Sequence, residues 1–370
     1  MKKWGAFFLS LAMALCLVAC GADEGGKNND APKDSKVTAM LFAQVEMTEE
    51  NYDGETSTMK GLVEYDADYN IIGTKTYVDG TLYYEVTYDK DMNKPLLELT
   101  YSETGEIIDR TENTYDEKGN RVERVNAYSY DDETVTIKEV STFDDNGNEL
   151  TQKVYEDGEL SYECRYTYTA DGKLEREAFI NKDGDEESYT EKTYDQQGNV
   201  LSVKVDGMLS GSYETYENIY EDGKLVEVKV YDQWEQDGAL VSHRKYDREG
   251  NEVLVVMYDG ETGEEWSRDE STYENGKLVK KVTYYEGKEE AIALYTYNSD
   301  GKLTERSYTP TGESSQRRVY TYNENGDLVG LKAYEGDETI SEYTMIYKSV
   351  SVSEEVAERI RETNALLESF

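Results

Sequence analysis

The chain has few of the residues on which many active sites depend. Its 370 residues include one histidine, three cysteines, three prolines and three tryptophans. The lone histidine, His243, stands in a strand-like stretch, where a single histidine is typically structural. No HExxH, GxSxG or GxxxxGK[ST] motif occurs, which argues against zincin, α/β-hydrolase and P-loop chemistry. We therefore expect no enzymatic activity and no cofactor.

Basic residues are also scarce. The chain has 39 Lys and Arg against 80 Asp and Glu, for a formal net charge of −41 at pH 7. Nucleic acid is excluded as a partner, because neutralising phosphates requires a basic face. Docking on an anionic membrane by charge alone is excluded for the same reason.

Tyrosine, in contrast, is abundant and regularly spaced. The chain has 34 Tyr against 6 Phe. The phrase YTYNENGDL at Tyr320–Leu328 has near copies at Tyr295–Leu303 and Tyr166–Leu174, and shorter forms recur between Tyr115 and Tyr322 with a period of about 26 residues. Such a period indicates repeat architecture. A looser copy about halfway through each period predicts one strand and one turn per half.

The alternation of side chains within these repeats is typical of strands. Leu225–Tyr231 and Leu278–Tyr284 alternate with a period of two, and each Asp/Asn-x-x-Gly segment has the chemistry of a hairpin turn. The predicted fold is all-β, a long antiparallel meander of hairpin repeats. Because open sheets of more than about ten strands usually curl, we expect a twisted, open spiral or solenoid-like sheet.

The N-terminus has the pattern of an export signal. Lys2 and Lys3 precede an apolar run that ends in Leu17-Val-Ala-Cys20. This resembles the lipobox of bacterial lipoproteins. The resemblance implies that residues 1–19 are a signal peptide, cleaved between Ala19 and Cys20, and that Cys20 carries lipid, including palmitate. The protein would then be extracytoplasmic, anchored to the outer face of the cell membrane, or to the outer membrane in a cell with two.

The rest of the chain divides by composition. Residues 20–36 lack large apolar side chains and predict a flexible tether, residues 37–110 contain eroded repeats, and residues 111–350 hold the regular array. Residues 351–370 begin with a capping-box pattern at Ser351–Glu354 and continue with a helical stripe, which predicts a C-terminal capping helix. Of the cysteines, only Cys164 would remain free, so no internal disulfide is expected.

The phrases YTYNSDGKL and YTYNENGDL resemble the YD repeats of the RHS family. In large RHS proteins such repeats form a spiralling strand array that wraps into a shell around a variable C-terminal domain. The resemblance covers about two-thirds of this chain and implies strand-and-turn repeats in an extracellular setting. This chain is too short to enclose a domain, and it contains no recognisable autoproteolytic core or effector domain.

Two groups of residues are candidates for binding. Aromatic rings near turns can stack on sugars or peptides; the candidates are Trp234, Trp266, Tyr231, Tyr258 and Tyr284. Alternating oxygen ligands give weak Ca²⁺ candidates at Asp89, Asp91, Asn93, Asn181, Asp183 and Asp185. For these, a solvated hairpin turn is the favoured interpretation, so no metal site is predicted.

These features predict a non-enzymatic, lipid-anchored envelope protein whose repeat sheet binds or scaffolds a glycan or protein ligand. The alternative is a hydrolase-like or processing role, or a secreted partner in an RHS-type system. A glycosidase would need two carboxylates held across a cleft, and no pair stands out among the many acidic residues.

Overall fold

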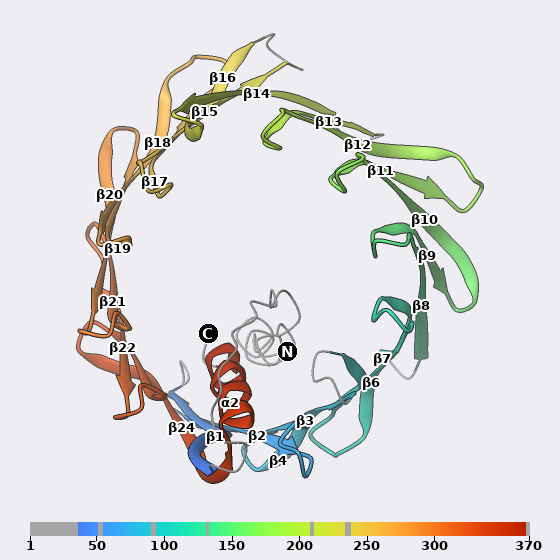
Figure 1. Cartoon of the computed structure of the whole chain (residues 1–370). Helices are drawn as coiled ribbons and strands as arrows, with labels where there is room; N and C mark the ends of the chain where they lie inside the picture. Colours follow the sequence, from blue (N-terminus) through green and yellow to red (C-terminus); the bar gives the residue numbers. More distant parts are fainter. Residues whose placement is uncertain are drawn as a thin grey trace. The chain divides into compact units, whose positions relative to one another are not determined.

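The computed structural model describes residues 36–50, 55–89, 94–130, 133–207, 211–233 and 238–367. The predicted signal peptide, Ala19, Cys20 and nearly all of the predicted tether lie outside this range. The described chain is built from strands and a single C-terminal helix (Figure 1). No helix among the described residues is long and apolar enough to cross a membrane.

The chain divides into two units. The first contains Met1–Ile137, Tyr320–Ala333 and Thr339–Phe370, and the second contains Lys138–Val319 and Tyr334–Glu338. The strands are β1 (Lys36–Glu50), β2 (Thr56–Tyr65), β3 (Ile71–Val78), β4 (Thr81–Tyr88), β5 (Pro95–Tyr101), β6 (Ile107–Tyr115), β7 (Arg121–Tyr130), β8 (Glu133–Phe143), β9 (Glu149–Glu156), β10 (Glu159–Tyr168), β11 (Leu174–Asn181), β12 (Glu186–Tyr194), β13 (Val200–Gly207), β14 (Ser212–Glu221), β15 (Lys224–Asp232), β16 (Ala239–Tyr246), β17 (Glu252–Tyr258), β18 (Glu265–Glu274), β19 (Lys277–Tyr285), β20 (Lys288–Tyr297), β21 (Leu303–Pro310), β22 (Gln316–Tyr322), β23 (Leu328–Glu335) and β24 (Glu338–Ser353). The helix is α2 (Glu354–Leu367).

Within each unit the strands pair antiparallel with their neighbours in sequence, as a meander requires. The all-β meander is therefore confirmed, but the predicted open, spiral or solenoid-like sheet is wrong. The first strand, β1, pairs with β2 on one side and with the last strand, β24, on the other, so the first and last strands of the meander do not leave open edges. The physical reason is that an open sheet would leave two edges of unpaired backbone N–H and C=O groups.

The repeat tyrosines occupy a fixed position in the sheet. Most turns that follow a repeat tyrosine are flanked by a β-bulge, in which one extra residue follows the tyrosine's cross-strand partner. In β12 and β13, Tyr194 pairs with Val200 and Thr193 pairs with Ser202, which leaves Leu201 as the extra residue. The same shift occurs where Tyr168 pairs with Leu174. The bulge changes which residues oppose one another along the rest of each strand pair.

The hydroxyl of a repeat tyrosine donates a hydrogen bond to a backbone carbonyl in the preceding repeat. Tyr194 Oη bonds the Leu174 carbonyl at 2.6 Å, and Leu174 is itself the bulge partner of Tyr168. Equivalent bonds run from Tyr65 to Phe42, Tyr115 to Pro95, Tyr168 to Glu149, Tyr297 to Leu278 and Tyr347 to Leu328. Each of these tyrosines thus reaches back 19 to 23 residues along the chain, to the strand that precedes its own.

The largest apolar clusters lie in the first unit. One cluster contains Phe42, Val45, Ile71, Val86, Tyr88, Leu328, Leu331 and Met345. A second joins β1 to α2 through Ala39, Leu41, Val352, Ala357 and Ile360. In the second unit the buried apolar residues are small or β-branched and are spread over the strands, for example Ala178, Val230 and Val256.

Helix α2 covers β1 and does not cover a sheet edge, because β24 already occupies that edge (Figure 1). Its first turn is capped by Ser353, whose hydroxyl accepts a hydrogen bond from Val356 N at 3.4 Å, two residues after the predicted cap at Ser351. The buried Asn364 accepts a hydrogen bond from Phe42 N at 3.1 Å and donates one to the Met40 carbonyl. The helix therefore satisfies backbone groups at the bulge in β1.

Candidate ligand-binding surface

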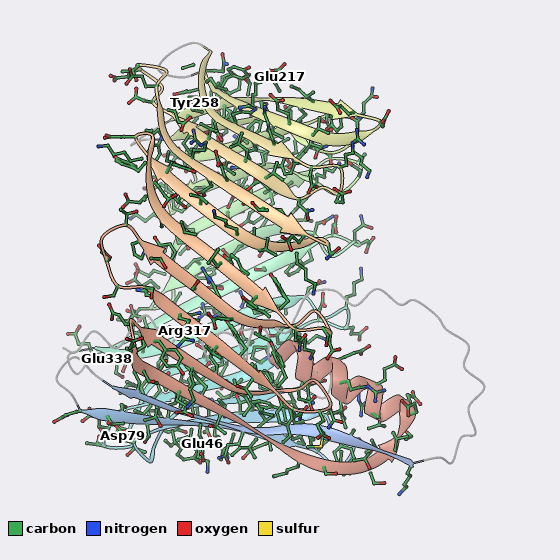
Figure 2. All side chains as sticks on the ribbon, turned by 90° about the vertical axis from the view of Figure 1, so that its left-hand side faces the viewer. Glu46, Asp79, Glu217, Tyr258, Arg317 and Glu338 are labelled. Carbon is green, nitrogen blue, oxygen red and sulfur yellow. The ribbon has the colours of Figure 1, made fainter. Side chains whose placement is uncertain are left out.

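The predicted tyrosines share one structural position in the second unit. Tyr231, Tyr258 and Tyr284 stand at or next to the last residue of β15, β17 and β19. Each also marks a shift of register with the following strand. These three strands run in the same direction, because strands alternate in a meander, so the three tyrosines lie at the same end of the sheet. Figure 2 labels Tyr258 at this end.

Each tyrosine has its own local partner. Tyr231 Oη donates a hydrogen bond to Glu217 Oε2 at 2.9 Å, and burial, the larger cause, together with this bond raises the pKa of Tyr231. Burial likewise raises the pKa of Tyr258. Tyr284 is the cross-strand partner of Arg268, whose guanidinium carbon lies 4.4 Å from the ring centroid.

Arg268 is held by two carboxylates. Its Nη1 lies 2.9 Å from Glu265 Oε1, and its Nε lies 2.9 Å from Glu270 Oε1. A guanidinium that is fixed on both sides and stacked on Tyr284 cannot move far from the ring. The face of Tyr284 is thus occupied by the chain itself, so this ring is a support and not a free stacking surface.

Trp266 and Tyr285 are the most exposed aromatic pair at this end of the sheet. Trp266 is 43% exposed and Tyr285 is 47% exposed. Their ring centroids are 6.1 Å apart with an interplanar angle of 81°, an edge-to-face contact that fixes one ring against the other. We name Trp266 and Tyr285 the aromatic platform, whereas Tyr284 and Arg268, the adjacent cross-strand pair, lie on the other face of the sheet. Trp266 and Tyr284 were predicted from the sequence but Tyr285 was not, although the doubled tyrosine at the end of β19 is visible in the sequence.

Tyr231 and Tyr258 lie on strands other than those of this platform. Trp234 lies outside the described residues. Tyr231 and Tyr258 belong to β15 and β17, and the polar contact found for Tyr231 is with Glu217 on β14. The structure therefore does not gather into one site the four predicted aromatic residues that it describes, Trp266, Tyr231, Tyr258 and Tyr284.

The predicted calcium candidates form ordinary turn contacts. Asn181 Oδ1 accepts hydrogen bonds from the backbone N–H groups of Asp183 and Asp185, each at 3.0 Å. Asp91 and Asn93 lie outside the described residues, and Asp89 Oδ2 lies 3.9 Å from Lys94 Nζ. Among the described residues no group of three His, Cys, Asp or Glu side chains could hold a metal ion.

The two residues with the greatest chemical reactivity lie within the sheet. His243 Nε2 lies 2.9 Å from Glu227 Oε1, and its side chain is 14% exposed. Cys164 is half-buried in β10, and burial raises the pKa of its thiol, which makes the reactive thiolate less available.

A shallow groove of about 500 Å³ between two turns of the second unit is lined by Glu227, Lys245 and Arg248, among others.

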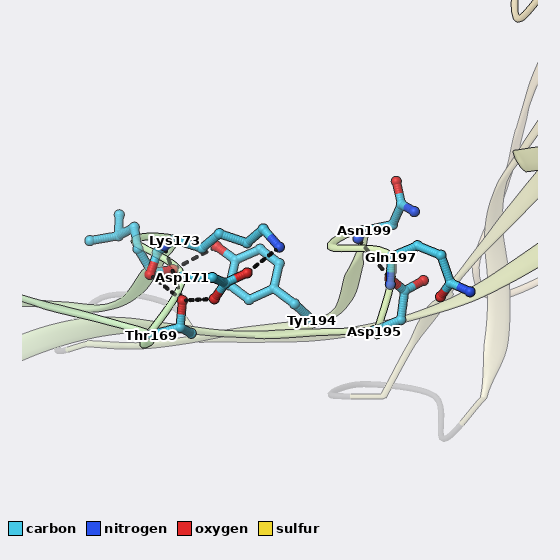
Figure 3. A network of polar contacts seen from close by, with 8 residues as sticks. Thr169, Asp171, Lys173, Tyr194, Asp195, Gln197 and Asn199 are labelled. Carbon is cyan, nitrogen blue, oxygen red and sulfur yellow. Dashed lines mark hydrogen bonds and ion pairs between the residues drawn. The ribbon is translucent and has the colours of Figure 1, made fainter.

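A lysine ladder along the turns was not predicted from the sequence. In Figure 3, Lys173 of one turn extends over the ring of Tyr194, next to the following turn, with its Nζ 5.5 Å from the ring centroid. The same contact joins Lys94 to Tyr115 and Lys277 to Tyr297. The sequence signal was a lysine at the end of a turn, about 20 residues before the next repeat tyrosine.

No protein-family model matches the sequence, and no curated protein matches it. Among solved structures, the chain is similar to the Photorhabdus luminescens Tc holotoxin pore at 11% identity and a TM-score of 0.35, covering 84% of this chain and 19% of that chain. It is similar to a TcdB2-TccC3 structure without the hypervariable C-terminal region at 11% identity and a TM-score of 0.31, covering 84% of this chain and 24% of that one.

A porin-like protein from Bacteroides uniformis is similar at 14% identity and a TM-score of 0.24, covering 83% of this chain and 98% of that chain. The present chain spans between a fifth and a quarter of the length of the Tc toxin chains. These likenesses do not test the predicted lipid anchor. The relation to YD repeats therefore depends on the strand-and-turn unit itself, with its tyrosine and its Asp/Asn-x-x-Gly turn.

Proposed function

We propose that the chain is a lipid-anchored extracytoplasmic protein that binds glycan through the aromatic platform and acts without catalysis. The observation that supports this proposal best is the exposed Trp266–Tyr285 pair, in edge-to-face contact. Rigid aromatic rings offer an apolar face to a sugar ring at low cost in conformational entropy.

The start of the described chain suits an anchored protein. The first described residue, Lys36, pairs with Ser353 at the end of β24, directly before α2. In the proposal, lipid on Cys20 holds this end of β1 near the membrane surface. A tether of 16 residues spans roughly 20–24 Å as a flexible coil, which leaves the strand ends free to meet an extracellular ligand.

The binding proposal is tested with purified full-length protein on a glycan array and on cell-wall material. Trp266→Ala should lose binding, and Tyr128→Ala, which removes another exposed aromatic ring in the first unit, should retain it. Equal binding by wild type and Trp266→Ala would contradict the platform as the binding surface. Hydrolysis of a bound polysaccharide would overturn the non-catalytic part of the proposal.

The anchor is tested separately in cells. Cys20→Ser should move the protein from the membrane fraction to the soluble extracytoplasmic fraction, because no acyl chain would then be attached. If the Cys20→Ser variant stayed in the membrane fraction, a feature other than lipid on Cys20 would be holding the protein there.

A further inference from the structure

Two arginines stand directly opposite each other in the second unit. Arg306 of β21 is the cross-strand partner of Arg318 of β22, and Arg306 is also the partner of Tyr295 of β20. Cross-strand partners in an antiparallel pair lie on the same face of the sheet. The Arg306 guanidinium carbon lies 5.7 Å from the centroid of the Tyr295 ring, as this arrangement requires.

This pairing is unfavourable by itself. Like charges directly opposite each other on adjacent strands destabilise a sheet. The chain has two acidic residues for every basic one, so a carboxylate partner would be easy to supply. Nevertheless, in the part of the chain that the structure describes, no ion pair joins either guanidinium to a carboxylate, and both side chains are exposed.

The adjacent arginine shows the usual arrangement. Arg317 points to the other face of β22, since successive side chains alternate. Its Nη1 lies 3.5 Å from Glu305 Oε2, and its guanidinium stacks on Tyr334 at 4.3 Å. The charge of Arg317 is therefore matched within the chain, whereas the charges of Arg306 and Arg318 are not.

We infer that Arg306 and Arg318 form a binding site for the carboxylate of an acidic sugar. Two guanidiniums that face each other can both donate N–H groups to one carboxylate, a charge-assisted geometry that a single lysine cannot provide. Tyr308, two residues from Arg306 on the same face and 38% exposed, offers a ring surface for the sugar. Its cross-strand partner is the small residue Ala293.

The net charge limits the size of the ligand. A charge of −41 repels polyanions, but at physiological salt the potential of distant carboxylates decays over about 8 Å. A ligand with one carboxylate feels mainly the two arginines, whereas a long polyanion meets the acidic surface around them. The site therefore fits a single uronic acid residue, such as the end of an otherwise neutral glycan. It is separate from the aromatic platform of β18 and β19, and neither proposal depends on the other.

The test is calorimetric titration of the full chain with galacturonate, galactose and inorganic phosphate at fixed pH and salt. We expect galacturonate to bind wild type, Trp266→Ala and Arg317→Gln alike, and to bind Arg306→Gln or Arg318→Gln roughly ten- to a hundredfold more weakly, the range for loss of a charged hydrogen bond. Arg317→Gln is the matched control, since it removes the same charge from the opposite face of β22.

Three results would overturn the inference. The first is no galacturonate binding by wild type, and the second is equal binding by Arg306→Gln, Arg318→Gln and wild type. The third is equal binding of galactose or inorganic phosphate, which would show that the carboxylate or the sugar ring does not contribute. Circular dichroism of each variant, compared with wild type, separates loss of the site from loss of the fold.

Discussion

Each repeat tyrosine combines an apolar ring with one directed hydrogen bond. The ring of Tyr194 lies under Lys173, and its hydroxyl bonds the Leu174 carbonyl at 2.6 Å. Phenylalanine could supply the ring but not the bond, which explains why the chain contains so many more tyrosines than phenylalanines. At these positions the repeat therefore requires the tyrosine hydroxyl as well as the aromatic ring.

Tyr194→Phe should therefore destabilise the second unit. Removing the hydroxyl leaves the Leu174 carbonyl without its donor, which costs about 0.5–1.5 kcal/mol in the free energy of unfolding. Urea unfolding followed by circular dichroism measures the change. Tyr213→Phe, at an exposed tyrosine, is the control and should unfold like wild type. Equal midpoints for Tyr194→Phe and wild type would show that water replaces the bond at no cost.

The lysine ladder predicts a difference between two turn glycines. Gly198 and Gly250 have nearly the same φ, +89° and +91°, so an added methyl group strains both turns alike. A Cβ at Gly198 would also contact the end of Lys173, whereas a Cβ at Gly250 would meet nothing within 4 Å. Gly198→Ala should thus displace Lys173 from Tyr194 and cost about 0.5–1 kcal/mol more than Gly250→Ala.

Thermal melts of these two glycine variants, each also carrying Lys173→Met, give the matched comparison. Without the Lys173 ammonium the two substitutions should cost the same. If Gly198→Ala still lowered the melting temperature more than Gly250→Ala in the Lys173→Met background, the two turn backbones would differ and the lysine ladder would not explain the difference.

At the scale of single elements, α2 completes the bulge of β1. Asn364 is 2% exposed, and its side-chain amide bonds both Phe42 N and the Met40 carbonyl. Ala43 is the extra residue that shifts the register between β1 and β24 at this point. The helix therefore supports the pairing that closes the sheet through hydrogen bonds as well as through Ala357 and Ile360.

Asn364→Ala should weaken that pairing. It leaves a buried backbone donor and a buried acceptor unsatisfied, which costs about 1–3 kcal/mol for each such group. Hydrogen exchange at the Phe42 amide is the direct measurement, and it should become faster. Glu362→Ala changes an exposed residue of the same helix and should leave this exchange unchanged. Equal exchange in Asn364→Ala and wild type would show that the helix is not needed to protect the bulge.

Local elements could be predicted from the sequence, but the contacts between distant elements could not. Alternation and turn residues placed β15 and β19 to within one residue at each end, because both signals lie inside the segment. The pairing of Lys36 with Ser353 joins opposite ends of the chain, and no local pattern encodes it. A long meander can equally well stay open, so the expectation of an open spiral failed there.

The candidate sites show the same limit. Trp266 could be chosen from the sequence as an aromatic residue near a turn, but its contact with Tyr285 depends on the hairpin geometry. Arg306 and Arg318 are cross-strand partners because of the register between β21 and β22, and this register cannot be read from the sequence. On the preceding pair of strands, the bulge between Thr296 and Tyr297 shifts every later partner by one residue.

At the scale of the whole molecule, the turn carboxylates should set the acid limit of stability. Asp66, Asp116, Asp144 and Asp247 each open a turn, and their pKa values are lowered from the ordinary value of 3.8 chiefly by a hydrogen bond from the amide of the asparagine four residues later. Because the pKa of each carboxyl is lower in the folded state than in the unfolded state, its contribution to the free energy of unfolding is complete at pH values above its unfolded-state pKa. It is lost as the pH falls through the lower, folded pKa.

Replacing all four aspartates by asparagine should remove this acid sensitivity and keep the turns. Asparagine already opens the turn at Asn323, where its Oδ1 accepts the backbone N–H groups of Asn325 and Asp327 at 2.9 Å each. Melting temperatures between pH 6 and pH 2.5 should fall less for the quadruple variant than for wild type. The charge-matched control replaces exposed Glu103, Glu117, Glu249 and Glu261 by Gln, which reduces the net charge equally but leaves the turn bonds intact. If the control flattens the profile as much as the aspartate variant does, relief of the net negative charge, and not the turn bonds, determines the response to acid.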